Sequence, residues 1–149
     1  MPGAFSGSLA GTNDIRALVE HDATKLLGRT SAGTLKLAED DKGLRAEIDL
    51  PDVSYANDLK ALVKRGDIKG MSFGFRVPDN GQRFMKENGL TVRELTNINL
   101  KEVTVTANPA YGDTSVHVRV DPAAVALAAT VEYPTKAIAA RKLIIATAS

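Results

Sequence analysis

Residues 69–77 read KGMSFGFRV, and this stretch decides the fold class. Large apolar side chains occupy every second position from Met71 to Val77, and the positions between them are small or polar. Alternation with a period of two is typical of a β-strand with one face on a hydrophobic core. The stretch therefore predicts a core strand that presents Ser72, between two glycines, on the opposite face.

A second strand of the same kind is predicted at 100–107, LKEVTVTA, where valines alternate with Glu102, Thr104 and Thr106. Side chains at alternate positions of a strand share one face. If the two strands are neighbours, these three polar side chains lie on the face that carries Ser72.

The rest of the chain predicts a mainly β protein with peripheral helices. Apolar residues at helical spacing between 52 and 66 indicate one amphipathic helix ending near Gly66. Further strands are predicted around 15–22, 33–40, 43–50 and 115–120, and residues 90–107 supply one more candidate before the strand at 100–107. Short antiparallel strands favour a closed or nearly closed antiparallel β-barrel with helices outside it, because closure hides strand edges.

The C-terminal part differs in composition. Residues 1–120 form the expected main domain, and the Ala-rich residues 121–149 predict a helical C-terminal extension of the same domain. Leu143, Ile144 and Ile145 are consecutive, so they cannot all face one side of a lone helix or strand. We expect this tail to pack on the barrel or on a second subunit and to cover an open strand edge.

Composition excludes several classes of function. The 149 residues suffice for one domain, and 19 basic against 18 acidic residues give no charge excess for binding nucleic acid or a membrane surface. No cysteine is present, which excludes disulfides, thiolate catalysis and Cys-ligated zinc. No apolar run is long enough for a transmembrane helix. We expect neither a metal nor another cofactor, and a cytoplasmic location.

The Gly-Met-Ser-Phe-Gly string at 70–74 matches the nucleophile elbow of α/β-hydrolases, G-x-S-x-G. The elbow requires a strand, a sharp turn and a helix, whereas this sequence continues as a strand. A serine hydroxyl becomes nucleophilic only beside a base, and the chain offers His21 and His117 for that role.

The residues alone leave several alternatives open. The acid that orients a base could be Asp22, Glu102 or Asp113. A small esterase-like hydrolase would use Ser72, Asp113 and His117. The simplest alternative is a solvent-facing serine in a catalytically silent scaffolding module.

Several blocks of the sequence, in order, closely resemble the tailed-phage prohead (procapsid) maturation serine proteases, which are related in fold to herpesvirus assemblin. The blocks are PGAF at 2–5, EHD at 20–22, LGRTSAGTLKL at 27–37, GLRAEIDLPD at 43–52, DLKALVKRGDIKGMSFGF at 58–75 and LKEVTVTANPAYGDTSV at 100–116.

The resemblance implies a serine endopeptidase that cleaves scaffold and capsid protein inside an assembling procapsid in the host cytoplasm. It implies His21 as the general base, Ser72 as the nucleophile that forms an acyl-enzyme, and Glu102 as the third member. The irregular loop at 107–112, ANPAYG, is a candidate for the backbone donors that stabilise the oxyanion.

Overall fold

The computed structural model describes residues 3–110, 112–121, 124–132 and 142–144. Two α-helices and a short 3₁₀ turn interrupt a chain made mostly of strands. The helical segments are α1 Ser6–Ala10, the 3₁₀ turn Thr30–Ala32 and α2 Ser54–Arg65. The strands are β1 Arg16–Val19, β2 Asp22–Arg29, β3 Leu35–Glu39, β4 Gly43–Asp49, β5 Gly70–Arg76, β6 Gln82–Glu87, β7 Leu90–Leu95, β8 Asn99–Thr106, β9 Thr114–Asp121, β10 Ala124–Glu132 and β11 Lys142–Ile144.

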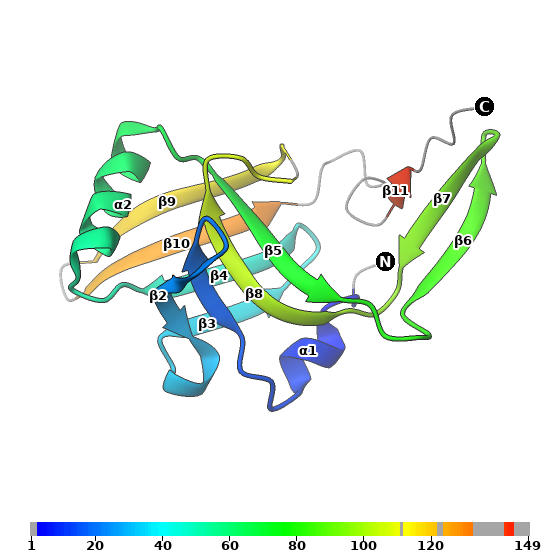
Figure 1. Ribbon diagram of the computed structural model, residues 1–149, viewed down its shortest axis with the longest axis horizontal. Helices are drawn as coiled ribbons and strands as arrows, with labels where there is room; N and C mark the ends of the chain where they lie inside the picture. The colour runs from blue at the N-terminus through cyan, green and yellow to red at the C-terminus, as the bar shows by residue number, and fades with distance from the viewer. Residues whose placement is uncertain (1–2, 111, 122–123, 133–141, 145–149) are drawn as a thin grey trace.

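These strands form three sheets (Figure 1). One has the order β2-β1-β8-β5, the second β3-β4-β10-β9 and the third β11-β7-β6. The predicted core strand is β5, and it pairs with β8 antiparallel, as expected for neighbours. The first sheet therefore carries the residues singled out in the sequence.

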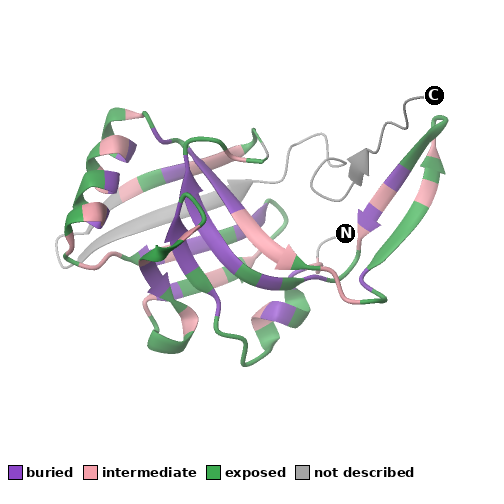
Figure 2. Cartoon of the chain, viewed as in Figure 1, coloured by how far each residue is buried: buried purple, intermediate pink, exposed green. Residues whose placement is uncertain are grey.

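The core lies between the two four-stranded sheets. Val103 and Val105 of β8 and Met71 of β5 are fully buried there. Leu44 and Ile48 of β4 join the same cluster from the second sheet. Buried residues accordingly dominate β1, β8 and the start of β5, whereas β6 is largely exposed (Figure 2). The valine face of β8 is thus the core face, and Glu102 and the threonines occupy the other one.

Helix α1 fixes the far end of the β5–β8 pair. The ring of Phe5, just before α1, meets Phe73 of β5 edge to face, with ring centroids 5.3 Å apart. Ser8 Oγ donates to the carbonyl of Ile98 at 2.6 Å and accepts from the amide of Leu100 at 2.8 Å. Phe5, the last residue of the PGAF block, is therefore part of the core.

Helix α2 matches the predicted amphipathic helix. It buries Ala56, Leu59 and Val63, residues three or four positions apart along one helical face. Gly66 adopts the left-handed conformation at φ 86° and ends the helix, its amide bonding to the carbonyl of Leu62.

A closed barrel is not confirmed, because the described strands form separate sheets. The edges of the two large sheets approach each other, and the amide of Val116 in β9 donates to the carbonyl of Lys69 just before β5. One such bond is not a continuous ladder. The expectation of antiparallel pairing throughout was also wrong, because β1 pairs with β8 in parallel.

The helical prediction for residues 121–149 was wrong where the structure describes them. Ala124–Glu132 form β10, which pairs with β4 on one side and β9 on the other. Two complete ladders of backbone hydrogen bonds outweigh the modest helix propensity of alanine. Residues 122–123, 133–141 and 145–149 lie outside the described part.

The tail does cover a strand edge, as expected from its apolar run. Lys142–Ile144 form β11, which pairs antiparallel with β7. Strands β6 and β7 extend away from the two main sheets, and β11 lies beside β7 (Figure 1). The tail therefore widens a projecting two-stranded ribbon into a three-stranded sheet.

Deleting residues 135–149 should expose the edge of β7 and promote self-association, because an unpaired strand edge is a template for pairing. We expect larger particles by light scattering and a Tm lower by about 2–4 °C for each kcal/mol of lost pairing. A chain lacking only residues 146–149 keeps β11 and is the matched control. Equal Tm and particle size in the two truncations would contradict the prediction.

Within the described residues, neither helix reaches the length and hydropathy that a bilayer-spanning segment needs.

Candidate active site

Ser72 lies in the middle of β5, directly opposite Thr104 of β8. Facing residues of an antiparallel pair share one side of the sheet. The same register places Gly74 opposite Glu102. Ser72 and Glu102 therefore lie on the same face of the sheet, away from the core. Solvent reaches this face only in part at Ser72, which is 5% exposed.

The two glycines that flank Ser72 are explained by close packing. A Cβ atom at Gly70 would lie 2.5 Å from the ring of Pro109, and one at Gly74 would lie 2.5 Å from Oε1 of Glu102. No real side chain tolerates such distances without a shift of its neighbours. The G-x-S-x-G string thus belongs to a continuous strand, as expected, and not to a hydrolase elbow.

His21 lies in the tight turn between β1 and β2. Val19 pairs with Asp22, so the turn consists of Glu20 and His21 alone. Both have positive φ, 50° and 57°, the backbone conformation of a type I′ hairpin turn. The imidazole projects from this turn with 49% of its side chain exposed.

The imidazole is hydrogen-bonded to Glu102. His21 Nδ1 and Glu102 Oε1 are 2.6 Å apart although 81 positions separate the residues in the sequence. The parallel pairing of β1 with β8 brings them together, because it sets the turn after β1 beside the strand that carries Glu102. Glu102 Oε2 is buried and makes no hydrogen bond to the described residues. Among the described residues, the imidazole of His21 is therefore the hydrogen-bond partner of the Glu102 carboxylate.

Thr104 links the nucleophile candidate to the base candidate. It faces Ser72 across the strands, and its fully buried hydroxyl accepts a hydrogen bond from the amide of His21 at 2.9 Å. The same hydroxyl donates to the carbonyl of Leu18 at 3.2 Å. No hydrogen bond joins Ser72 Oγ to His21 in the described part of the structure. Catalytic hydrogen bonds are often long before substrate binds, so this geometry is compatible with a triad.

Asp22, the other acid beside His21, is engaged elsewhere. Its Oδ1 accepts from the hydroxyl and the amide of Thr24 at 2.6 and 2.9 Å. These hydrogen bonds, the hydroxyl first, lower the pKa of Asp22 below its usual value, and Lys25 adds to the effect. The Asp22 carboxylate therefore bonds to Thr24 at the start of β2, and Glu102 is the acid that bonds to the imidazole of His21.

His117 of the alternative set with Asp113 lies on a strand that runs away from Ser72. Thr114 Oγ1 accepts from the amide of Met71, and the amide of Val116 donates to the carbonyl of Lys69. Each step along β9 thus leads toward the start of β5 and away from Ser72. His117 is exposed and pairs through its backbone with Ala128 of β10.

Comparison with known proteins shows the family of the chain. The family model described as caudovirus prohead serine protease matches residues 1–126. The chain belongs to this family. The prohead protease of Enterobacteria phage HK97 is 36% identical over 114 residues, covering 74% of this chain and 47% of that protein. The chain therefore spans about half the length of the curated relative it matches. No solved structure matches it significantly.

The loop after β8 contributes fewer free donors in this prohead-protease chain than the sequence suggested. The amide of Ala107 donates to Glu20 and that of Asn108 to Thr106 Oγ1, while Pro109 has no amide hydrogen. The first three positions of the candidate oxyanion loop are therefore already engaged or have no donor. Of its described residues, Ala110 and Gly112 remain candidates.

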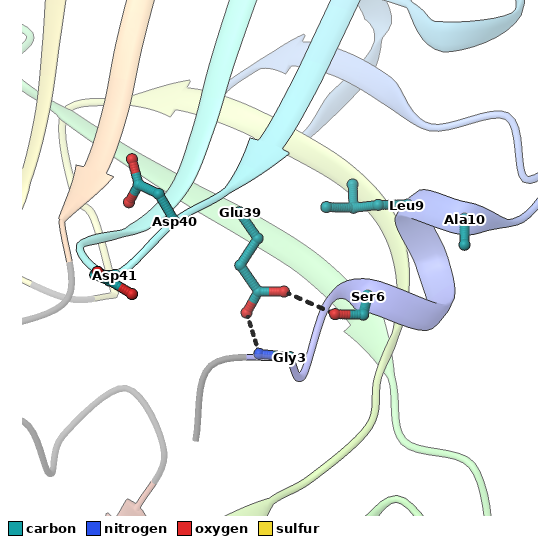
Figure 3. A pocket seen from close by; sticks show the side chains of 7 residues that line it. All are labelled: Gly3, Ser6, Leu9, Ala10, Glu39, Asp40 and Asp41. Atoms are coloured by element: carbon teal, nitrogen blue, oxygen red, sulfur yellow. Dashed lines mark hydrogen bonds between the residues drawn. The ribbon is translucent and has the colours of Figure 1, made fainter.

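A hollow of about 570 Å³ lies elsewhere, between α1 and the turn from β3 to β4 (Figure 3). It is lined in part by three carboxylates, those of Glu39, Asp40 and Asp41. Glu39 accepts from the amide of Gly3 and from the hydroxyl of Ser6. Glu39 thus holds the segment before α1, and none of the predicted catalytic residues lines the hollow. Among the described residues, no group of three or more acids and histidines could hold a metal ion.

The structure brings forward three residues that the sequence did not single out. Gly74 gives the Glu102 carboxylate its space, Thr104 bonds to the turn that carries the base, and Glu20 bonds to the loop after β8. The threonine was visible as part of the polar face of its strand. Glu20 belongs to the EHD block, but the sequence did not indicate its role because its partners are 86 and 87 positions away.

Proposed function

We propose that this chain is the catalytic domain of a serine endopeptidase that cleaves scaffold and capsid protein inside an assembling phage procapsid. The observation that carries the proposal is the hydrogen bond of 2.6 Å between His21 and Glu102 beside the face that presents Ser72. Membership in the prohead serine protease family supplies the substrate class. The relationship to the barrel of herpesvirus assemblin is part of the same proposal.

The hydrogen bond to Glu102 decides which ring nitrogen does the chemistry. A carboxylate accepts, so Nδ1 of His21 carries the hydrogen and Nε2 is left as the proton acceptor. His21 Nε2 takes the proton of Ser72 Oγ as that oxygen attacks the scissile carbonyl carbon. The resulting imidazolium is stabilised by the Glu102 carboxylate.

The remaining steps follow from proton balance. The tetrahedral intermediate expels the amine of the scissile bond, which takes the proton from His21 Nε2 and leaves an acyl-enzyme on Ser72. A water molecule then gives a proton to His21 Nε2 and attacks the ester carbonyl. The second tetrahedral intermediate releases the new carboxyl terminus, and Ser72 Oγ takes back the proton from His21 Nε2 as it leaves. Each oxyanion-hole donor in such a reaction contributes about 3–4 kcal/mol.

A fluorophosphonate probe tests the proposal, because it phosphonylates a serine that a neighbouring base activates. We expect stoichiometric labelling of Ser72, located by peptide mass spectrometry. His21→Ala should suppress labelling, and His117→Ala should leave it unchanged. Labelling that depends on His117 would favour the esterase, and absence of labelling in the folded chain would favour a silent scaffolding module.

A further inference from the structure

The turn that carries His21 is strained. Glu20 and His21 both adopt left-handed backbone conformations, although neither is glycine. Two-residue hairpin turns of this kind usually contain Asn-Gly, because residues other than glycine, asparagine and aspartate are disfavoured in the left-handed backbone conformation. Such a conformation costs about 1–3 kcal/mol per residue and persists only where the surroundings impose it.

Backbone contacts to β8 hold part of this turn. The amide of Glu20 donates to the carbonyl of Val105 at 3.0 Å. The amide of His21 donates to the hydroxyl of Thr104 at 2.9 Å. Both amides of the strained turn are therefore anchored to the strand that also carries Glu102.

The side chain of Glu20 supplies a third anchor. One carboxylate oxygen accepts from the hydroxyl of Thr106 at 2.6 Å, and the other accepts from the amide of Ala107 at 2.7 Å. Thr106 is 2% exposed and its hydroxyl also accepts from the amide of Asn108 at 3.1 Å. Glu20 forms no ion pair with the described residues. The hydrogen bonds its carboxylate makes are therefore those from the Thr106 hydroxyl and the Ala107 amide.

We propose that Glu20 is a positioning residue for the general base. Its carboxylate fastens the strained turn to the end of β8, which keeps the imidazole of His21 directed at Glu102. The same two hydrogen bonds fix the first residues of the loop that follows β8. This inference rests on the proposed function, because it assumes that His21 is the base.

The geometry predicts a specific order among substitutions of Glu20. The Thr106 hydroxyl and the Ala107 amide both donate, so the two oxygens of a carboxylate can accept from both at once. In Glu20→Gln the side-chain oxygen still accepts from the amide of Ala107. The side-chain NH₂ group faces Thr106 Oγ1, which would then accept a hydrogen bond instead of donating one. Glu20→Asp is one methylene shorter and would not reach both partners. Glu20→Ala loses both.

We expect Glu20→Ala and Glu20→Asp to lower the rate of Ser72 phosphonylation about 10- to 100-fold, since small misplacements of a catalytic group have effects of this size. Glu20→Gln should stay within about threefold of the wild type, because neutral hydrogen bonds retain about half the strength of charged ones. Asp41→Ala, an exposed acid in the turn between β3 and β4, is the control and should keep the full rate.

Two measurements separate positioning from a general effect on folding. Thr106→Val should slow labelling on its own but add little in the Glu20→Ala background, because the two changes remove the same hydrogen bond. The proton of His21 Nδ1 should give a strongly downfield NMR signal in the wild type and in Glu20→Gln, and a broadened one in Glu20→Ala. An unchanged signal and rate in Glu20→Ala would overturn the proposal.

The spectrum also distinguishes this proposal from the proposed function. If the wild-type chain is not labelled at all, the proposed protease activity fails. The downfield signal would still report whether Glu20 holds His21 on Glu102. Loss of that signal in Glu20→Ala at an unchanged Tm would uphold the positioning contact even then.

Discussion

Ser72→Ala and His21→Ala should each reduce cleavage of scaffold and capsid protein about 10⁵- to 10⁶-fold, and the double variant should be no worse than either. The nucleophile and the base act in one step, so removing either one removes that step. Glu102→Gln should cost less, about 10²- to 10⁴-fold, because the base is then present but poorly oriented. The measurement is the initial cleavage rate of purified substrate, followed by gel electrophoresis and mass spectrometry.

The second histidine provides the control for this experiment. His117 is exposed on β9, and β9 leads away from Ser72 along β5. His117→Ala should therefore cleave at the wild-type rate. A loss equal to that of His21→Ala would refute the assignment of the base.

Gly74→Ala should lower the cleavage rate about 10²- to 10⁴-fold with a small change in Tm. The new Cβ atom would lie 2.5 Å from Oε1 of Glu102, the oxygen that bonds to His21. The end of a side chain gives way more readily than a strand, so the carboxylate should turn aside and the imidazole should lose its partner. The expected loss is that of a triad without its acid.

A double-mutant cycle checks this cause. In the Glu102→Ala background the carboxylate is absent, so Gly74→Ala should add almost nothing. Gly7→Ala is a matched control, because its Cβ atom would meet only the amide tip of Asn97, at 3.2 Å. Additive effects of Gly74→Ala and Glu102→Ala would show that the alanine acts on the strand and not on the carboxylate.

The strands of the site were predictable because their side chains alternate between the core and the other face. The alternation from Met71 to Val77 predicted β5, and the valines of β8 correctly placed Glu102 and Thr104 on the face of Ser72. Period-two burial leaves a direct mark in the sequence. The amphipathic helix α2 was predictable for the same kind of reason.

Features that depend on distant partners were not predictable. The Ala-rich stretch of β10 lacks a strong strand signal and becomes a strand because β4 and β9 offer ladders on both sides. The parallel pairing of β1 with β8 joins segments about 86 residues apart, and no local pattern reports it. Closure of the barrel stays a prediction, because strand edges do not determine how sheets join.

The parallel pairing of β1 with β8 also governs when the proposed pair of His21 and Glu102 can assemble during synthesis. His21 is made early, and the strand that holds both its acid and the anchors of its turn is made only after residue 98. Chains emerge from the ribosome N-terminus first, so a nascent chain that ends before β8 has neither the acid nor the partner of β1. A fragment cut short in the projecting β6–β7 ribbon would likewise carry His21 and Ser72 without Glu102. The order of the strands therefore delays the contact between His21 and Glu102 until β8 has been synthesised.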